Sequence, residues 1–210
     1  MKLNDIYRRI SPRFRSKRMA QFLSMVRPDA GSRVIDLGGY PWVWTESGAQ
    51  FSVVLVNIHV PEGAKGYGAR FQMLEGDATR LSFEDRSFDI VYSNSVIEHL
   101  GTWDKQQAFA SEARRVGRKV WVQTPARWFP VEPHLVTLFV HYFSKDVQRH
   151  LLRWFTVWGW MNRPSSQQVA DFLAEVRLLT LREMKELFPD CQILRERLFG
   201  LTKSYIAIRL

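Results

Sequence analysis

The stretch RVIDLGG, residues 33–39, is a short apolar run that ends in two glycines. A run without alternating polar residues is typical of a strand buried on both faces, and such strands belong to parallel sheets. Further runs of this kind lie at residues 51–58, 71–74, 88–93 and 120–124. Because these runs alternate with connecting segments, the sequence predicts an open α/β sheet with helices on both faces.

Helical patterns precede and connect these runs. Residues 103–116 repeat apolar side chains every three or four positions, and Gly117 is placed as the C-terminal stop of that helix. Residues 1–30 form a basic helical arm, in which we expect Pro12 to split the helix and Pro28 to end it. The sequence thus predicts a helical arm ahead of the sheet.

The regular alternation stops at the end of the predicted core, residues 31–125. Residues 126–165 are rich in Pro, Trp, Phe and His, and they predict an irregular insertion or lid with an amphipathic helix around residues 145–158. Residues 166–210 then close the fold with a helix and two adjacent apolar runs, which suggest an antiparallel hairpin. We therefore expect a single domain over residues 1–210.

The composition excludes several classes of protein. Hydrophobic residues make up 46% of the 210 residues, so the chain can bury enough apolar surface to fold, and intrinsic disorder is excluded. The single cysteine, Cys191, excludes an internal disulfide, and the sequence start lacks the apolar segment of a signal peptide. No apolar stretch reaches the ~18 residues of a membrane span. We expect a cytoplasmic protein, either free or peripheral to the inner face of the membrane.

The net charge of +9 lies outside the middle of the chain. Residues 1–34 carry 9 Lys and Arg against 2 Asp and Glu, whereas residues 35–142 carry 10 against 12. Residues 145–163 combine basic charge with Trp and Phe, which suits either a lid over a site or a peripheral contact with a membrane surface. The distribution of charge therefore indicates which surface the protein docks on or which ligands enter its site, and it says little about the reaction.

Small and polar residues follow four of the predicted strands. Glycines close the first strand, Asn57 ends the second, and residues 76–78 (GDA) and 93–95 (SNS) follow the third and fourth. Right-handed crossovers place the carboxyl ends of parallel strands on one edge of the sheet, where ligands bind. Asn57 lies where a ribose-binding group belongs in such folds. The pattern predicts a nucleotide-like site on this edge.

Two segments resemble a known family. Residues 75–78 (EGDA) and 87–100 (SFDIVYSNSVIEHL) look closely like the central signature of class I S-adenosylmethionine-dependent methyltransferases, nearest to their type 11 group. The resemblance covers residues 30–125 well, the last two strands moderately, and the arm and insertion hardly at all. It implies a Rossmann-like sheet of seven mostly parallel strands with an antiparallel final strand. It also implies S-adenosylmethionine as cofactor and a methyltransferase activity (EC 2.1.1.-).

The resemblance assigns a role to the glycine loop. Asp36 and Gly38 are expected to line the methionine part of the cofactor, and Gly39 to allow close approach of the backbone. The family usually has glycine at the positions that Tyr40 and Trp42 occupy here, so the loop departs from the pattern. This departure leaves open a methyltransferase fold that has lost its cofactor.

The other strand ends receive roles in the same way. Asn57 stands where the family usually has an acidic residue that holds both ribose hydroxyls, and a neutral amide loses the charge-assisted hydrogen bond. Asp77 is expected to accept a hydrogen bond from the adenine amino group, with the backbone N–H of Ala78 near the ring. Asn94 is expected beside the sulfonium and the methyl group.

Methyl transfer needs a base only where the acceptor is a hydroxyl or a protonated amine, and histidine is the usual base. His134 comes shortly after the fifth strand, in a turn stiffened by prolines on both sides of Glu132. We place His134 first as general base, with Glu132 as its orienting carboxylate, and His99 second. Structural roles in a turn or at a helix start compete with both assignments. No residues have the spacing of a metal site.

The expected acceptor is a small molecule or a lipid-linked one, bound for in-line displacement of the methyl group. Two alternatives stay open: a non-catalytic binding protein with this fold, and an RNA methyltransferase suggested by the basic arm. Nucleic acid is the weaker expectation, because no RNA-binding module is recognisable. The sequence predicts no particular oligomeric state.

Overall fold

The computed structural model describes residues 3–60, 68–132, 135 and 137–210, with side chains from residue 15 onward. In this part of the chain one seven-stranded sheet has the order β3-β2-β1-β4-β5-β9-β8. Its strands are β1 (Arg33–Leu37), β2 (Ser52–Asn57), β3 (Phe71–Glu75), β4 (Phe88–Asn94), β5 (Gly117–Pro125), β8 (Gln192–Leu198) and β9 (Leu201–Arg209). Strands β1 to β5 are parallel, and β9 is antiparallel to both of its neighbours. The predicted fold class is confirmed.

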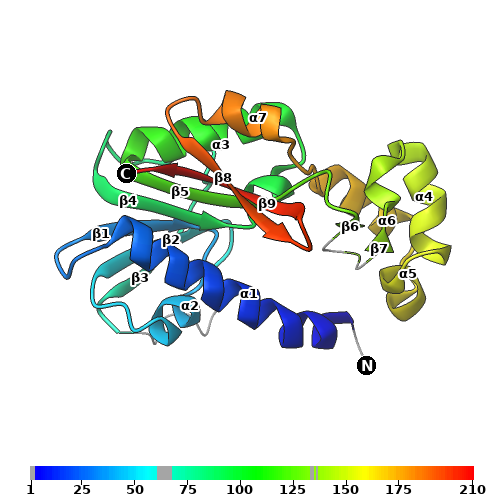
Figure 1. The fold of residues 1–210 in the computed structure, drawn as a ribbon, viewed down its shortest axis with the longest axis horizontal. Coiled ribbons are helices and arrows are strands. Elements are labelled where there is room, and N and C mark those ends of the chain that lie inside the picture. Colours follow the sequence, from blue (N-terminus) through cyan, green and yellow to red (C-terminus); the bar gives the residue numbers. More distant parts are fainter. Residues whose placement is uncertain (1–2, 61–67, 133–134, 136) are drawn as a thin grey trace.

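Helices cover both faces of the sheet (Figure 1). On one face lie α3 (Trp103–Val116) and α7 (Leu181–Leu187), and on the other lie α1 (Leu3–Val26) and α2 (Pro41–Glu46). Two apolar cores result, one on each side of the strands. The carboxyl ends of β4 and β5 point toward the insertion and the N-terminal half of α1 (Figure 1).

The helix α1 is anchored by a buried aromatic cluster. Phe22 is fully buried and meets Tyr92 edge to face, with ring centroids 4.9 Å apart. It contacts Trp44 and Trp121 in the same manner, at 5.9 and 5.7 Å. Edge-to-face aromatic pairs add stability beyond the area that they bury. The C-terminal part of α1 is therefore part of the core.

Two predictions about the elements were wrong, and one was confirmed. The helix α1 continues through Pro12 instead of being split there. Gly117 ends α3 as predicted, since it is the C-cap, and it also begins strand β5, where a Cβ would lie 2.5 Å from a methyl group of Val91. The helix expected over residues 145–158 is two helices, α4 (Lys145–Trp154) and α5 (Val157–Asn162).

The break between α4 and α5 has a local cause. The hydroxyl of Thr156 donates to the carbonyl of Leu152, 2.5 Å away, and accepts from the N–H of Gly159 at 2.8 Å. A Cβ on Gly159 would lie 2.2 Å from the same Leu152 carbonyl, so α5 can turn tightly against the end of α4. Thr156 is thus an N-cap that restarts the helix in a new direction.

The insertion has a small core of its own. Its elements are β6 (Val131–Glu132), β7 (Thr137–Leu138), the 3-10 turn η3 (Val140–Tyr142), α4 and α5, followed by α6 (Ser166–Glu175), which we did not predict. Leu152 is fully buried there against apolar side chains from the turn and from α6. In the described part of the chain no helix combines the length and the apolar character that crossing a membrane requires.

One carboxyl group is buried in the core beneath α1 and α2. Asp36 is 2% exposed, the indole N–H of Trp44 donates to its Oδ2 at 2.7 Å, and its Oδ1 has no hydrogen-bond partner among the described residues. Burial raises the pKa of Asp36 to about 7, against the opposing effect of the Trp44 hydrogen bond. Asp36 in turn contributes, after burial, to raising the pKa of its cross-strand neighbour Tyr92.

This buried carboxyl predicts a falling stability between about pH 4 and pH 7. The folded protein holds the Asp36 proton more tightly than the unfolded chain, so the free energy of unfolding decreases as the pH rises through this window. We expect Asp36→Asn to stabilise the protein at pH 8 by up to about 4 kcal/mol, and hardly at all at pH 4. Denaturant unfolding at both pH values measures this, with the exposed Asp171→Asn as control. Parallel pH curves for wild type and Asp36→Asn would refute the assignment.

Candidate cofactor site

The glycine loop after β1 is shaped by close contacts within the protein. Gly38 has a φ of 83°, and a Cβ on it would lie 2.5 Å from a methyl group of Val96. A Cβ on Gly39 would lie 1.6 Å from Oδ2 of Asp36. Both positions therefore require glycine whatever the loop binds. The glycines thus let the loop pack tightly over Asp36 and Val96.

Asn57, at the end of β2, holds this loop in place. Its Nδ2 donates to the carbonyl oxygen of Gly39 over 2.7 Å. A carboxylate at this position has no hydrogen to donate and would face the carbonyl with like partial charge. The neutral side chain therefore fits the altered loop, and its Oδ1 has the acceptor chemistry for a hydroxyl ligand.

Asp77 and Ala78 lie directly after β3. The exposed Asp77 accepts at its Oδ1 from the backbone N–H and the hydroxyl of Thr79, both at 2.8 Å, which fixes the turn. Ala78 is half-buried against the core on the α3 side of the sheet. A carboxylate held in a fixed turn at the sheet edge has the chemistry expected for the adenine amino group.

Asn94, at the end of β4, is bound by the N-terminal arm. Arg18 of α1 donates from Nη1 to Oδ1 of Asn94 at 2.6 Å and to Oε1 of Gln123 at 2.8 Å. Its Nε lies 3.5 Å from Oε2 of Glu196 on β8. The arm thus supplies a half-buried cation to the edge where the sulfonium was expected, a contact that no local sequence pattern reveals.

A second cation lies close to this group. Burial lowers the pKa of Lys203 to about 8, although the carboxylate of Glu196 opposes this change, and Arg18 lowers the pKa further. The guanidinium of Arg18 and the amine of Lys203 thus both interact with the carboxylate of Glu196 near the carboxyl edge of the sheet.

Of the three predicted catalytic residues, Glu132 and His99 lie in the described part of the chain. His134 lies outside the described residues. Glu132 is buried, and its Oε2 accepts from the backbone N–H of Leu135 at 2.6 Å. Its charge also acts on His141, whose pKa is lowered by burial and raised less strongly by Glu132. His99 is half-buried, with Nδ1 3.1 Å from Oε1 of Glu175 on α6.

The glutamate beside His99 has a structural role. Glu98 is fully buried in the turn η2 (Ile97–Leu100), and Thr124 on β5 donates to its Oε2 at 2.9 Å. This bond ties the turn after β4 to the end of β5, and so holds His99 at the carboxyl edge of the sheet. Of the two acidic neighbours of His99, Glu175 rather than Glu98 meets its ring.

Comparison with known proteins agrees with this geometry. Residues 48–119 match the family described as "Methyltransferase domain". A search of curated protein sequences finds no match. Among solved structures, a SAM-dependent methyltransferase from Methanosarcina mazei is similar, with a TM-score of 0.50 and 14% identity over 86% of this chain and 92% of that one.

Two further solved structures share the fold. The Burkholderia thailandensis 1,6-didemethyltoxoflavin-N1-methyltransferase, solved with S-adenosylhomocysteine, has a TM-score of 0.56 and 12% identity over 90% of this chain and 74% of that one. The Haemonchus contortus phosphoethanolamine N-methyltransferase 2, solved with S-adenosyl-L-methionine, has a TM-score of 0.55 and 18% identity, over 85% of this chain and 38% of that one. The predicted resemblance is confirmed: the chain has the class I methyltransferase fold, and its residues 48–119 match the methyltransferase-domain family.

Proposed function

We propose that the protein uses S-adenosylmethionine to methylate a small-molecule or lipid-linked acceptor. The observation that carries this proposal is the methyltransferase-domain match over residues 48–119, which includes the predicted ligand positions Asn57, Asp77 and Asn94. All three end or follow parallel strands at the carboxyl edge of the sheet. In open α/β sheets this edge is where ligands bind.

The donor set fits the cofactor. Asn57 offers an amide oxygen for ribose hydroxyls, and Asp77 offers a carboxylate for an exocyclic amine. The unpartnered Oδ1 of Asp36 lies under the loop that is expected to meet the methionine part. Two structural neighbours were solved with this cofactor or its demethylated product, which supports the same choice here. When bound, S-adenosylmethionine supplies an electrophilic methyl group on a sulfonium.

The protein's contribution is alignment. In-line displacement needs the acceptor atom opposite the leaving sulfur, and such positioning accounts for most of the rate gain in reactions of this type. The tightly packed glycine loop offers its backbone to the methionine part of the cofactor. The hydrogen bond from Asn57 to the carbonyl of Gly39 keeps that loop in position. Arg18 fixes the side chain of Asn94, so the polar group nearest the expected methyl position has one orientation.

For acceptors that must lose a proton, we place His99 as the general base, with Glu175 orienting its ring. The Nδ1 of His99 lies 3.1 Å from Oε1 of Glu175, and a carboxylate beside one ring nitrogen fixes the orientation of an imidazole. His134 with Glu132 stays a prediction, and the hydrogen bond from Leu135 to Glu132 shows that this carboxylate also stabilises its own turn.

We expect calorimetric titration of the wild type with S-adenosylmethionine to give saturable heat. Asp77→Ala removes a charged acceptor, which we expect to weaken binding by about tenfold to a hundredfold. The control Glu84→Ala changes an exposed carboxylate outside the site and should bind like the wild type. Absence of heat for the wild type at millimolar cofactor would rule out the proposed function. Binding without any methyl transfer in an acceptor screen with labelled cofactor would favour the non-catalytic alternative.

We expect His99→Gln to lower kcat by about a hundredfold or more, with little change in KM, because a general base acts in the transition state. The measurement uses the acceptor found in the labelled screen, and His59→Gln, an exposed loop histidine, is the matched control. Glu175→Gln should give a smaller loss, since it keeps a hydrogen-bonding group beside the ring. Unchanged turnover in His99→Gln would transfer the role to His134 or show that the acceptor needs no base.

A further inference from the structure

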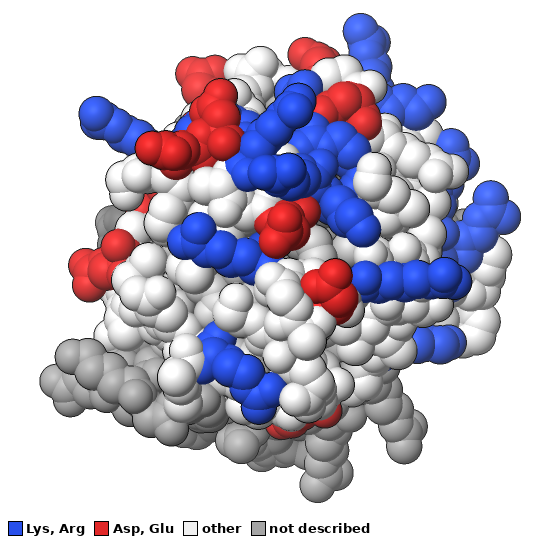
Figure 2. All heavy atoms as spheres, turned by 90° about the vertical axis from the view of Figure 1, so that its left-hand side faces the viewer, with Lys and Arg blue, Asp and Glu red and all other residues white. Residues whose placement is uncertain are grey.

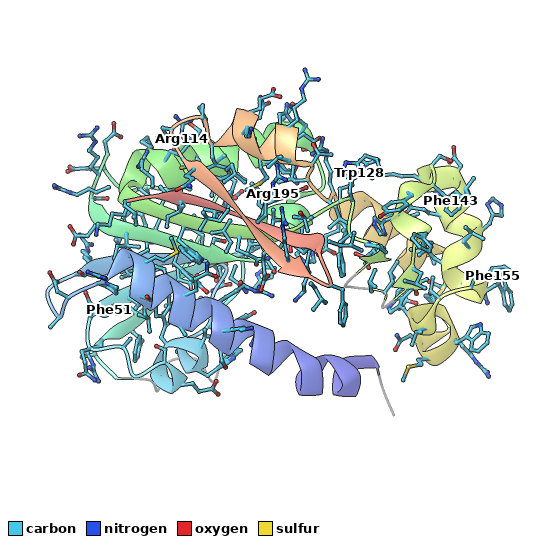
Figure 3. All side chains as sticks on the ribbon, in the orientation of Figure 1. Phe51, Arg114, Trp128, Phe143, Phe155 and Arg195 are labelled. Atoms are coloured by element: carbon cyan, nitrogen blue, oxygen red, sulfur yellow. The ribbon has the colours of Figure 1, made fainter. Side chains whose placement is uncertain are left out.

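Among the described residues, exposed large apolar side chains are most numerous in the insertion, residues 126–165, although Phe199 between β8 and β9 is exposed as well. We define the aromatic surface as Phe139, Phe143, Trp154, Phe155 and Trp160, which are 49%, 51%, 63%, 72% and 75% exposed. A group of large exposed aromatic side chains in one segment marks a candidate binding surface. Figure 3 shows Phe143 and Phe155 at the outer edge of the insertion, pointing away from the sheet.

Folding of the insertion does not need these side chains. Its own core is built from Leu135, Val140, Leu152, Val169 and Leu173, all buried. The aromatic surface lies outside this core, and its aromatic side chains do not cover the sheet as a closed lid would. The exposure is therefore a property of a packed structure and not of an unfolded segment.

The charge around the aromatic surface is basic. Arg149, Arg153 and Arg163 are exposed, and Arg153 lies 5.2 Å from the ring of Trp154. Asp146 is the acidic residue of α4, and it lies 3.4 Å from Arg149. The helix α1, which belongs to the basic arm, contacts α5. Exposed aromatics beside basic residues are the composition of a helix that lies in a membrane interface.

The opposite end of the molecule differs. Figure 2 shows basic and acidic side chains close together on that end. Several are paired there, including Arg114 with Asp190 and Arg115 with Glu112. By sequence, residues 1–34 carry a net charge of +7 and residues 143–163 a net charge of +3.

We propose that the insertion docks on the surface of an anionic phospholipid bilayer, with the aromatic surface in the headgroup region and the arginines on lipid phosphates. This inference goes beyond the proposed function, because membrane docking does not depend on methyl transfer. It has a geometric consequence for that function. The carboxyl ends of β4 and β5 face the insertion, so the docked insertion would lie between the candidate site and the bilayer (Figure 1).

The test is flotation with vesicles of phosphatidylcholine alone and of phosphatidylcholine with phosphatidylglycerol. We expect the wild type to float with the anionic vesicles, less so as the salt concentration rises, and hardly at all with the neutral ones. The triple variant Trp154→Ser/Phe155→Ser/Trp160→Ser should lose more than about tenfold in partitioning. Brominated lipids should quench the tryptophan fluorescence of the wild type and not that of the variant.

A second variant separates the charge from the aromatic side chains. Arg149→Gln/Arg153→Gln should lower partitioning by about fivefold per arginine. The matched controls are Arg182→Gln/Lys185→Gln, which removes two exposed charges from α7, and Leu210→Ser, which removes an exposed apolar side chain elsewhere. Both should float like the wild type, and circular dichroism with thermal unfolding checks that every variant is folded.

Three results would overturn the proposal. The first is a wild type that does not float with anionic vesicles at low salt. The second is flotation that neither the aromatic nor the arginine variant reduces. The third is a set of variants that keep vesicle binding and lose binding to an RNA oligomer, which would make the surface a nucleic-acid interface. None of these results depends on whether cofactor binds, so they are distinguishable from failure of the proposed methyl transfer.

Discussion

The hydrogen bond from the indole of Trp44 to the buried carboxylate of Asp36 is the interaction on which the cofactor side of the molecule depends. It joins α2 to the end of β1, and it places the carboxylate so close to Gly39 that no side chain fits there. Trp44 also fills the core against which Phe22 anchors the arm. A buried carboxyl group lowers the stability of the fold. Here the position of the Asp36 carboxyl also restricts residue 39 to glycine, in the loop where a ligand is expected.

The two departures from the family pattern explain each other. Tyr40 and Trp42 stand where the family usually has glycines, and their rings stack with centroids 4.4 Å apart. A loop altered in this way needs a new anchor, and Asn57 provides it through the carbonyl of Gly39. An acid at position 57 could not make that bond, since a carboxylate only accepts.

Much of the fold could be predicted because it depends on local periodicity. The helix at residues 103–116 and the strand at 33–37 have the predicted bounds. The helix α6 was missed although Ser165 and Gln168 form a capping box that is visible in the sequence. Arg18 could not have been found, because its partners Asn94 and Gln123 lie 76 and 105 residues away and only the packing of α1 brings them together.

The position of Arg18 also links the arm to the occupancy of the site. The same guanidinium holds Asn94 and Gln123, so these two bonds contribute to the free energy that keeps α1 on the sheet. A ligand group that competes for Asn94 must act against that contribution. By thermodynamic reciprocity, a docked α1 lowers the affinity for such a ligand by a certain factor, and the bound ligand lowers the docking equilibrium of α1 by the same factor. The first helix is therefore energetically coupled to whatever binds at the end of β4.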